Sequence, residues 1–234
     1  MSIASNLSVI RGRIARAANR ARRSPNDIVL MAVCKTQPAS KILEAYNAGQ
    51  YLFGENRVQE FAEKFSALAN LHDAEFHMIG HLQSNKAAKA VAIFHAVDSV
   101  DSARLAHRLN DAAKSLSKTV DALIEINIGG EEAKSGSGPD SPEIEAILSG
   151  APNWPHLRIR GLMTVPPFTE DPEGARPYFR KLRELRERLL TRKGQAVTLD
   201  ILSMGMSHDF EVAIEEGSTC VRIGTAIFGE RMHP

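Results

Sequence analysis

The sequence predicts an α/β protein built as a single parallel (β/α)8 barrel of the TIM type, with an extra helix before the first strand. Short apolar runs rich in β-branched residues recur eight times along the 234 residues, and stretches of helical periodicity separate them. The runs are apolar almost throughout, which is typical of parallel strands buried on both faces. Polar residues crowd just after the runs, at the strand ends where such barrels carry their sites. A doubly wound open sheet is the competing fold, because periodicity does not show whether a sheet closes.

The predicted strands are short apolar runs that end in or next to polar residues. Their β-branched content favours strand over helix. In chain order they are "IVLMAVCK" (28–35), "YLFGEN" (51–56), "FHMIG" (76–80), "FHAVDSV" (94–100), "DALIEINI" (121–128), "LRIRGLM" (157–163), "LDILSMG" (199–205) and "TCVRIG" (219–224).

Helical stretches precede and separate these strands. The first lies at residues 2–21, inside a segment (1–24) that we expect to pack on the barrel as an N-terminal helix. Proline at a helix start and glycine just past a helix end indicate further boundaries, as at Pro38 and Gly49. The other predicted helices are 39–49, 57–68, 84–91, 102–116, a short helix opening at Pro142, 175–190 and 208–217. We therefore predict one domain over residues 1–234.

The composition argues against several classes of protein. With 29 basic and 28 acidic residues the formal net charge is +1, which disfavours nucleic-acid binding and attachment to a membrane surface. No apolar run approaches the roughly 18 residues of a membrane span, and the N-terminus lacks the pattern of a signal peptide. The two cysteines, Cys34 and Cys220, form neither a C-x-x-C pair nor a zinc spacing. We expect a cytoplasmic protein without structural disulfides or a metal site.

Lys35 ends the first predicted strand, in "VLMAVCKTQP" (29–38), and its position has two interpretations. In one, the side chain extends past the apolar strand to reach solvent or a carboxylate. In the other, it is desolvated, and a desolvated lysine amine is nucleophilic enough to form an imine with an aldehyde. Position alone leaves both interpretations open.

Two glycine-containing turns follow the last two strands. Ser203, Gly205 and Ser207 in "SMGMSHDF" lie between a strand and a helix, and Gly224 and Thr225 in "RIGTAIFG" do the same. Backbone N–H groups at helix starts and small hydroxyl side chains bind phosphate, and the loops after strands seven and eight are the recurrent phosphate site of this fold. A plain strand-to-helix turn also favours glycine and serine. An imine-forming lysine beside a phosphate site suits pyridoxal phosphate, which carries both an aldehyde and a phosphate.

Six motifs of the sequence resemble one known family. The motifs are "VCKTQP", "FGENRVQE", "HMIGHLQSNK", "GLMTVPP", "LSMGMSHDFEVAIEEG" and "VRIGTAIFGER", which run in order from about residue 29 to residue 231. Together they are similar to the YggS/PROSC family of pyridoxal phosphate homeostasis proteins. The resemblance implies a single barrel like the N-terminal domain of alanine racemase, with pyridoxal 5'-phosphate on the lysine after the first strand.

The resemblance also implies a set of cofactor-binding residues. They are Lys35 (as a covalent aldimine), Asn56, His81, Ser203, Met204, Arg222, Gly224 and Thr225. Ser203, Gly224 and Thr225 would hold the phosphate. Arg222 would face the pyridine nitrogen, and Asn56 would lie near the ring. Met204 and Met206 would line the pocket but equally suit the core, and His81 equally suits a structural position.

An arginine at the pyridine nitrogen would limit catalysis. A guanidinium does not accept a proton, because its pKa lies above about 12, and it disfavours a protonated ring nitrogen beside it. The resemblance implies that racemases with the same arginine use a second base on the opposite face, a tyrosine from an additional domain. The tyrosines of this sequence, Tyr46, Tyr51 and Tyr178, lie outside the strand-end motifs, and only a few residues follow the last predicted strand. We therefore expect no catalytic residues and no efficient catalysis.

Three functions follow from these observations. The leading hypothesis is a protein of intracellular pyridoxal 5'-phosphate homeostasis that holds the cofactor on Lys35 and passes it to apo-enzymes. The second is an amino-acid racemase or related enzyme on the same cofactor. The third is a barrel enzyme acting on a sugar or triose phosphate, with Lys35 as an electrostatic clamp. The resemblance favours a monomer or weak dimer, without nucleic-acid or membrane partners.

Overall fold

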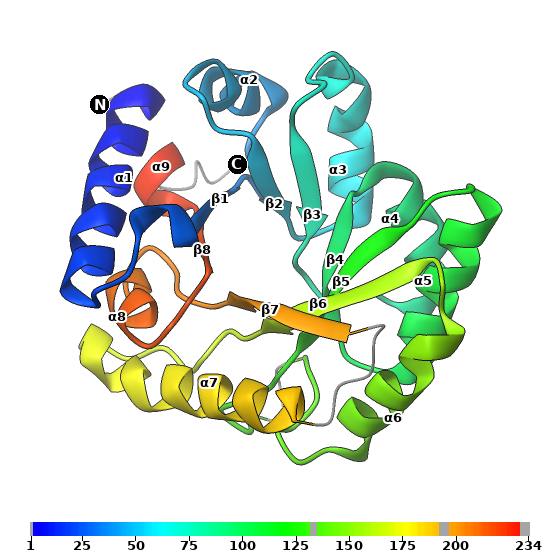
Figure 1. Cartoon of the computed structure of the whole chain (residues 1–234). Helices are drawn as coiled ribbons and strands as arrows, with labels where there is room; N and C mark the ends of the chain where they lie inside the picture. The colour runs from blue at the N-terminus through cyan, green and yellow to red at the C-terminus, as the bar shows by residue number, and fades with distance from the viewer. Residues whose placement is uncertain (1, 132–134, 192–196, 230–234) are drawn as a thin grey trace.

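Eight parallel strands form a closed barrel in the computed structural model, which describes residues 2–131, 135–191 and 197–229. Neighbouring strands pair in chain order, and the last strand pairs with the first. The strands are β1 (Val29–Val33), β2 (Leu52–Glu55), β3 (Glu75–Met78), β4 (Ala96–Val100), β5 (Val120–Glu125), β6 (Leu157–Met163), β7 (Val197–Ser203) and β8 (Cys220–Ile223). Figure 1 shows the strands at the centre, surrounded by helices. The predicted barrel is confirmed, and the open sheet is excluded.

Helices cover the outside of the barrel. They are α1 (Ile3–Arg20), α2 (Ala39–Asn47), α3 (Val58–Phe65), α4 (Ala87–Ile93), α5 (Ala103–Ser115), α6 (Pro142–Gly150), α7 (Arg176–Leu190), α8 (Phe210–Glu215) and α9 (Thr225–Phe228). The short α9 was not among the predicted helices. Residue 1 and residues 230–234 of the predicted domain lie outside the described residues.

The extra N-terminal helix joins the start of the chain to its last helices. Figure 1 shows α1 beside α8 and α9. The side chain of Ser2 caps α1 by accepting a hydrogen bond from the Ser5 N–H, as expected for serine at this position. The Asn6 side chain donates to the carbonyl of Ile227 at 2.8 Å, and Arg13 pairs with Glu211 at 2.8 Å. The helix therefore stabilises the side of the barrel that carries α8 and α9.

An aromatic cluster fills the space between β2, β3 and the helices α3 and α4. Phe53 and Phe76 stack at 5.3 Å, and Phe61 lies 4.7 Å from Phe94 and 4.8 Å from Phe76. All four rings are buried. Such ring pairs add about 0.5–1.5 kcal/mol each beyond area burial, so this cluster holds two neighbouring βα units together.

Strand β7 contains an irregularity that affects where it ends. Its pairing with β6 shifts between Ile159, opposite Val197, and Gly161, opposite Ile201. Leu199, inside the shift, has a φ of 54°, which non-glycine residues rarely adopt. The observed strand runs from Val197 to Ser203, two residues earlier at each end than the predicted one. The turn after β7 therefore begins at Met204, two residues earlier than predicted.

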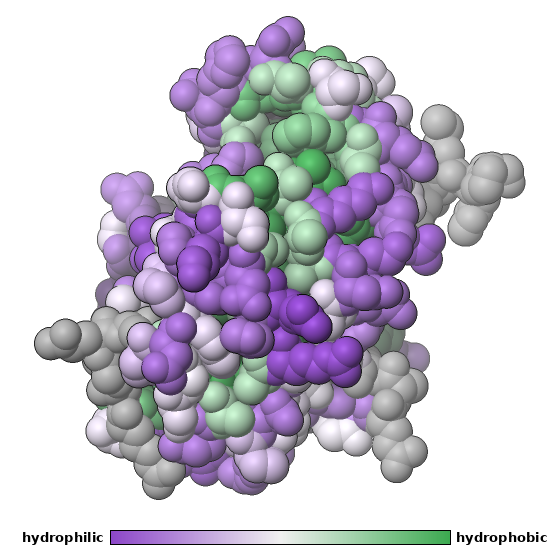
Figure 2. All heavy atoms as spheres, turned by 90° about the vertical axis from the view of Figure 1, so that its right-hand side faces the viewer, coloured by the Kyte–Doolittle hydropathy of each residue, from purple (hydrophilic) through white to green (hydrophobic). Residues whose placement is uncertain are grey.

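Hydrophilic residues cover much of the outer surface. Figure 2, turned toward the right-hand side of Figure 1, shows them along the rim and lower half of that face, with apolar residues gathered in its upper part. Within the described ranges, no helix is both long and apolar enough to cross a membrane.

Candidate functional site

A cavity of about 600 Å³ opens at the C-terminal ends of the strands. Its wall combines residues that follow several different strands, as in other barrels of this type. The lining residues are Val33, Lys35, Asn56, Ile79, Gly80, His81, Glu125, Ile126, Ser135, Val165, Met206, Ser207, His208, Arg222, Gly224 and Thr225. Six of the eight predicted site residues are among them.

Lys35 lies on this wall, half-buried, in the turn that follows β1. The turn is closed by a hydrogen bond from the Gln37 N–H to the Cys34 carbonyl at 3.0 Å. Thr36, the next residue, has a φ of 64°, and its N–H donates to Glu60 of α3 at 2.6 Å. A non-glycine residue in this conformation costs free energy unless its surroundings impose it. The contact with α3 therefore holds the turn that presents the lysine.

A buried ion pair lies behind this turn. The Lys64 ammonium contacts Glu55 at 2.7 Å and Glu60 at 3.2 Å, and it donates to the Gln37 carbonyl at 3.0 Å. Glu55 is fully buried, and the Cys34 thiol donates to the same Glu55 oxygen at 3.3 Å. Burial raises the pKa of Glu55, whereas the Lys64 charge counteracts this rise. The cluster links α3 to the residues on either side of Lys35.

Arg222 on β8 brings a buried positive charge to the floor of the cavity. Its guanidinium donates to Ser203 Oγ at 2.7 Å and to the Thr164 carbonyl at 2.6 Å. Burial lowers the pKa of Arg222, and nearby acidic groups counteract this decrease. Among these acidic groups are Asp98, Asp209 and Glu125. Its two hydrogen bonds fix the orientation of the guanidinium plane.

Two predicted residues lie beneath the cavity rather than on its described wall. Ser203 is fully buried, and its hydroxyl accepts the hydrogen bond from Arg222. Met204 packs in the hydrophobic core. Met206 and Ser207 line the cavity instead, because β7 ends at Ser203 and the following turn reaches the opening. Ser203 and Met204 are not among the residues that line the cavity. Their direct contact with a ligand stays a prediction.

Asn56 and His81 approach the cavity from neighbouring strand ends. A Cβ atom at Gly80 would overlap the backbone and side-chain oxygens of Asn56, so this glycine permits the close approach of the two loops. His81 is exposed, and its Nδ1 lies 3.3 Å from Asp101. His81 lines the cavity, and its contact with a ligand stays a prediction.

Sequence reasoning missed the wall contributed by β5. Glu125 is the last residue of that strand, only 7% exposed, and its Oε1 accepts a hydrogen bond from Ser135 Oγ at 2.8 Å. Both residues line the cavity. A carboxylate inside the apolar run "DALIEINI" was the available signal, because buried acids in such runs require a partner or a function.

A second ion pair lies inside the barrel. His77 on β3 is 3.1 Å from Asp98 on β4, and its side chain is 16% exposed. Burial lowers the pKa of His77, but the charge of Asp98 and the hydrogen bond to it outweigh burial and raise the pKa to about 9. The negative charge of Asp98 also raises the pKa of Arg222. Acidic and basic groups therefore alternate through the barrel interior.

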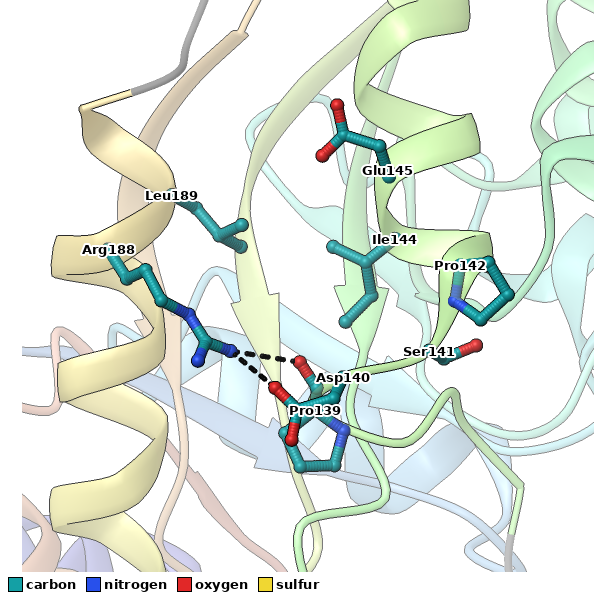
Figure 3. A pocket seen from close by; sticks show the side chains of 8 residues that line it. All are labelled: Pro139, Asp140, Ser141, Pro142, Ile144, Glu145, Arg188 and Leu189. Carbon is teal, nitrogen blue, oxygen red and sulfur yellow. Dashed lines mark hydrogen bonds and ion pairs between the residues drawn. The ribbon is translucent and has the colours of Figure 1, made fainter.

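A second depression lies on the outside, between α6 and α7. Figure 3 shows the residues that line it, with Arg188 reaching across to the loop before α6. The Arg188 guanidinium donates to the Pro139 carbonyl at 3.2 Å and to Asp140 at 3.0 Å. Its cation is already engaged with the protein, so the strand-end cavity is the better candidate site.

Comparison with known proteins gives consistent matches over nearly the whole chain. Residues 5–232 match the family model described as alanine racemase, N-terminal domain. The chain is 46% identical over 233 residues to the pyridoxal phosphate homeostasis protein of Aquifex aeolicus, covering 100% of both chains. It is 43% identical over 231 residues to the protein of the same name from Escherichia coli K12, covering 98% and 97% of the two chains.

Two solved structures show how the fold relates to other proteins. One, solved with PLP bound, is PipY of Synechococcus elongatus PCC7942, at 36% identity and a TM-score of 0.84, covering 97% of this chain and 100% of that one. The other is alanine racemase of Clostridium difficile 630, at 15% identity and a TM-score of 0.73, covering 98% and 56%. The second likeness concerns the fold alone.

Proposed function

Because this chain belongs to the pyridoxal phosphate homeostasis proteins of the alanine racemase N-terminal-domain family, we propose that it binds pyridoxal 5'-phosphate in the strand-end cavity. The cofactor is held as an imine with the Lys35 amine. The observation that carries the proposal is the convergence of Lys35, Arg222 and Thr225 on one cavity. The relatives' name and the cofactor in PipY support the choice of ligand.

The donor set of the cavity fits this cofactor. The Lys35 amine, on the cavity wall, would meet the aldehyde. Ser207, Gly224 and Thr225 line the part of the wall where α9 begins, and they offer hydroxyl and backbone groups to the phosphate. Arg222, whose guanidinium cannot act as an acceptor, would donate a hydrogen bond to the pyridine nitrogen. The cofactor itself supplies an aldehyde and a ring that can withdraw electrons from a bound amine.

The same arginine argues against efficient catalysis. Its hydrogen bonds to Ser203 and Thr164 fix it in place, and a fixed guanidinium keeps the ring nitrogen unprotonated. The chain's tyrosines lie elsewhere. Tyr46 and Tyr51 contact each other edge-on at 5.4 Å, and Tyr178 is on α7. We therefore propose a cofactor-holding protein, with an amino-acid racemase as the alternative.

Absorbance spectroscopy tests the covalent attachment. Purified protein mixed with pyridoxal 5'-phosphate develops an imine band, and Lys35→Ala abolishes it. Lys89→Ala, at an exposed lysine of α4, is the matched control and keeps the band. Borohydride reduction followed by peptide mapping labels Lys35. An unchanged band in Lys35→Ala, or a label on another lysine, would contradict the proposal.

Two further measurements separate the alternatives. A racemase exchanges the α-proton of an amino acid in deuterated water far faster than the free cofactor does, whereas a cofactor-holding protein does not. We also propose that the protein passes its cofactor to apo-enzymes in the cytoplasm, as a monomer or weak dimer. Recovery of activity by an apo-enzyme, faster than with the same amount of free cofactor, supports this transfer.

A further inference from the structure

Asp209 immediately precedes α8 but does not cap that helix. An aspartate at this position ordinarily accepts a hydrogen bond from an N–H group in the first turn of its own helix. No such bond is made within the described residues of α8, and Asp209 Oδ1 instead accepts from the Met206 N–H at 2.6 Å. The Asp209 N–H in return donates to the Met206 carbonyl at 3.2 Å. Because Asp209 is only 7% exposed, its carboxyl group is committed to the turn before the helix.

Gly205 brings this turn close to α8 and β8. Its φ is 95°, a conformation that favours glycine. A Cβ atom here would lie 2.5 Å from Ala213 Cβ and 2.9 Å from Phe210 Cα. The Gly205 carbonyl accepts a hydrogen bond from the Arg222 N–H at 2.9 Å. The turn is therefore tied to the strand that carries the arginine of the cavity floor.

The same turn contributes to the cavity wall. Met206 and Ser207 line the cavity together with Gly224 and Thr225. The Ala226 N–H of α9 donates to Ser207 Oγ at 3.5 Å, which is a long hydrogen bond. The turn thus places a serine hydroxyl beside the start of α9, where the proposed function places the phosphate. A change in the turn would move this hydroxyl.

We propose that Asp209 is a positioning residue for phosphate recognition, which acts through the Met206 N–H to hold Ser207 at the cavity. This assignment rests on the proposed function and names what fixes one part of its phosphate wall. The charge of a carboxylate does not attract phosphate, so Asp209 acts through the hydrogen bond that it accepts. Burial raises the pKa of Asp209, whereas this hydrogen bond and the charge of Arg222 lower it. A neutral acceptor in the same place should therefore serve almost as well.

Two substitutions separate the acceptor from the rest of the side chain. Asp209→Ala removes the acceptor, and the loss of one hydrogen bond to a charged group predicts about a ten-fold rise in the dissociation constant for pyridoxal 5'-phosphate. Asp209→Asn keeps an oxygen for the Met206 N–H and should stay within about three-fold of wild type. Asp200→Ala, at an exposed acid of β7, is the control and should bind as wild type does.

A ligand without a phosphate shows whether the effect is specific. The compound 5'-deoxypyridoxal has the same aldehyde and ring, with a methyl group in place of the phosphate-bearing arm, and the imine band follows its binding too. Asp209→Ala should bind it with wild-type affinity, because only the phosphate wall has changed. An equal loss for both ligands would indicate general damage to the barrel and overturn the inference. Binding of pyridoxal 5'-phosphate by Asp209→Asn as weak as by Asp209→Ala would overturn it too.

Asp209→Ser covers the case in which Asp209→Ala does not fold. Its oxygen lies one bond closer to the backbone than Oδ1, and serine suits the start of a helix. The inference expects Asp209→Ser to lose affinity for pyridoxal 5'-phosphate alone, and wild-type affinity for that ligand would overturn it. Failure of wild type to form an imine band, or a band in Lys35→Ala, instead contradicts the proposed function.

Discussion

Replacing Lys64 by methionine tests whether the buried ion pair behind Lys35 stabilises the protein. The substitution keeps the apolar stem and removes the ammonium that contacts Glu55 at 2.7 Å. Glu55 is fully buried, so its carboxylate then lacks a counter-charge. The least costly response is protonation of Glu55 in the folded state. Worked from the ordinary carboxyl pKa of 4.5, protonation at pH 7 costs about 3 kcal/mol at most, because burial already raises the pKa of Glu55.

The same reasoning predicts a pH dependence. At pH 5, protonating a carboxyl with an ordinary pKa of 4.5 costs only about 0.7 kcal/mol. The destabilisation by Lys64→Met should therefore shrink from at most about 3 kcal/mol at pH 7 to at most about 0.7 kcal/mol at pH 5. Adding Glu55→Gln to Lys64→Met should recover most of the loss at pH 7, because no buried charge is left.

Urea unfolding at 25 °C and at the two pH values measures these differences. Lys89→Met, at an exposed lysine of α4, is the control and should change the free energy of unfolding by less than about 0.5 kcal/mol. A loss of less than 1 kcal/mol for Lys64→Met at pH 7, or an equal loss at both pH values, would refute the reasoning.

Three other predictions concern the barrel and α1. The pKa of His77 is raised to about 9 in the folded protein. The stabilisation of the folded state by protonated His77 is therefore complete below pH 6.5 and is lost as the pH rises to about 9. The free energy of unfolding should fall by about 3 kcal/mol over this range, and by far less in His77→Gln. A Cβ at Gly161 would overlap the Ile201 carbonyl, so Gly161→Ala should cost at least about 2 kcal/mol. Gly12→Ala in α1, where the nearest atom is 3.6 Å away, should instead add about 0.5–1 kcal/mol in the same urea assay.

The strand pattern predicted eight parallel strands, because parallel strands buried on both faces give apolar runs of a recognisable length. It did not show that the sheet closes, since closure depends on pairing between the first and last strands. It also predicted where the site lies. Lys35, Arg222 and Thr225, which are distant in the sequence, share one cavity because all follow or end strands of the same sheet. In a closed barrel the C-terminal ends of all strands lie at one end, so residues that follow different strands come close together.

Sequence reasoning was less successful where local geometry decides which side chain faces the cavity. Ser203 and Ser207 are the same residue type, so the sequence does not show which of them reaches the cavity. The end of β7 decides this, and β7 contains the irregular pairing around Leu199. No periodicity signals a single residue with positive φ. Glu125 was missed for a different reason, since Ser135 and Ser137, which hydrogen-bond to it, lie in a segment with no helical or strand pattern.

The packing of α1 against α8 and α9 has a consequence for synthesis on the ribosome. The apolar stripe of α1, which includes Leu7 and Ile14, is made first, whereas its partners are among the last segments to be translated. At 5–20 residues per second, the delay is roughly ten to forty seconds. During that time the stripe is open to chaperones or to other nascent chains. The nascent protein also lacks Arg222 until then, so newly made copies acquire a complete cavity only when the barrel closes.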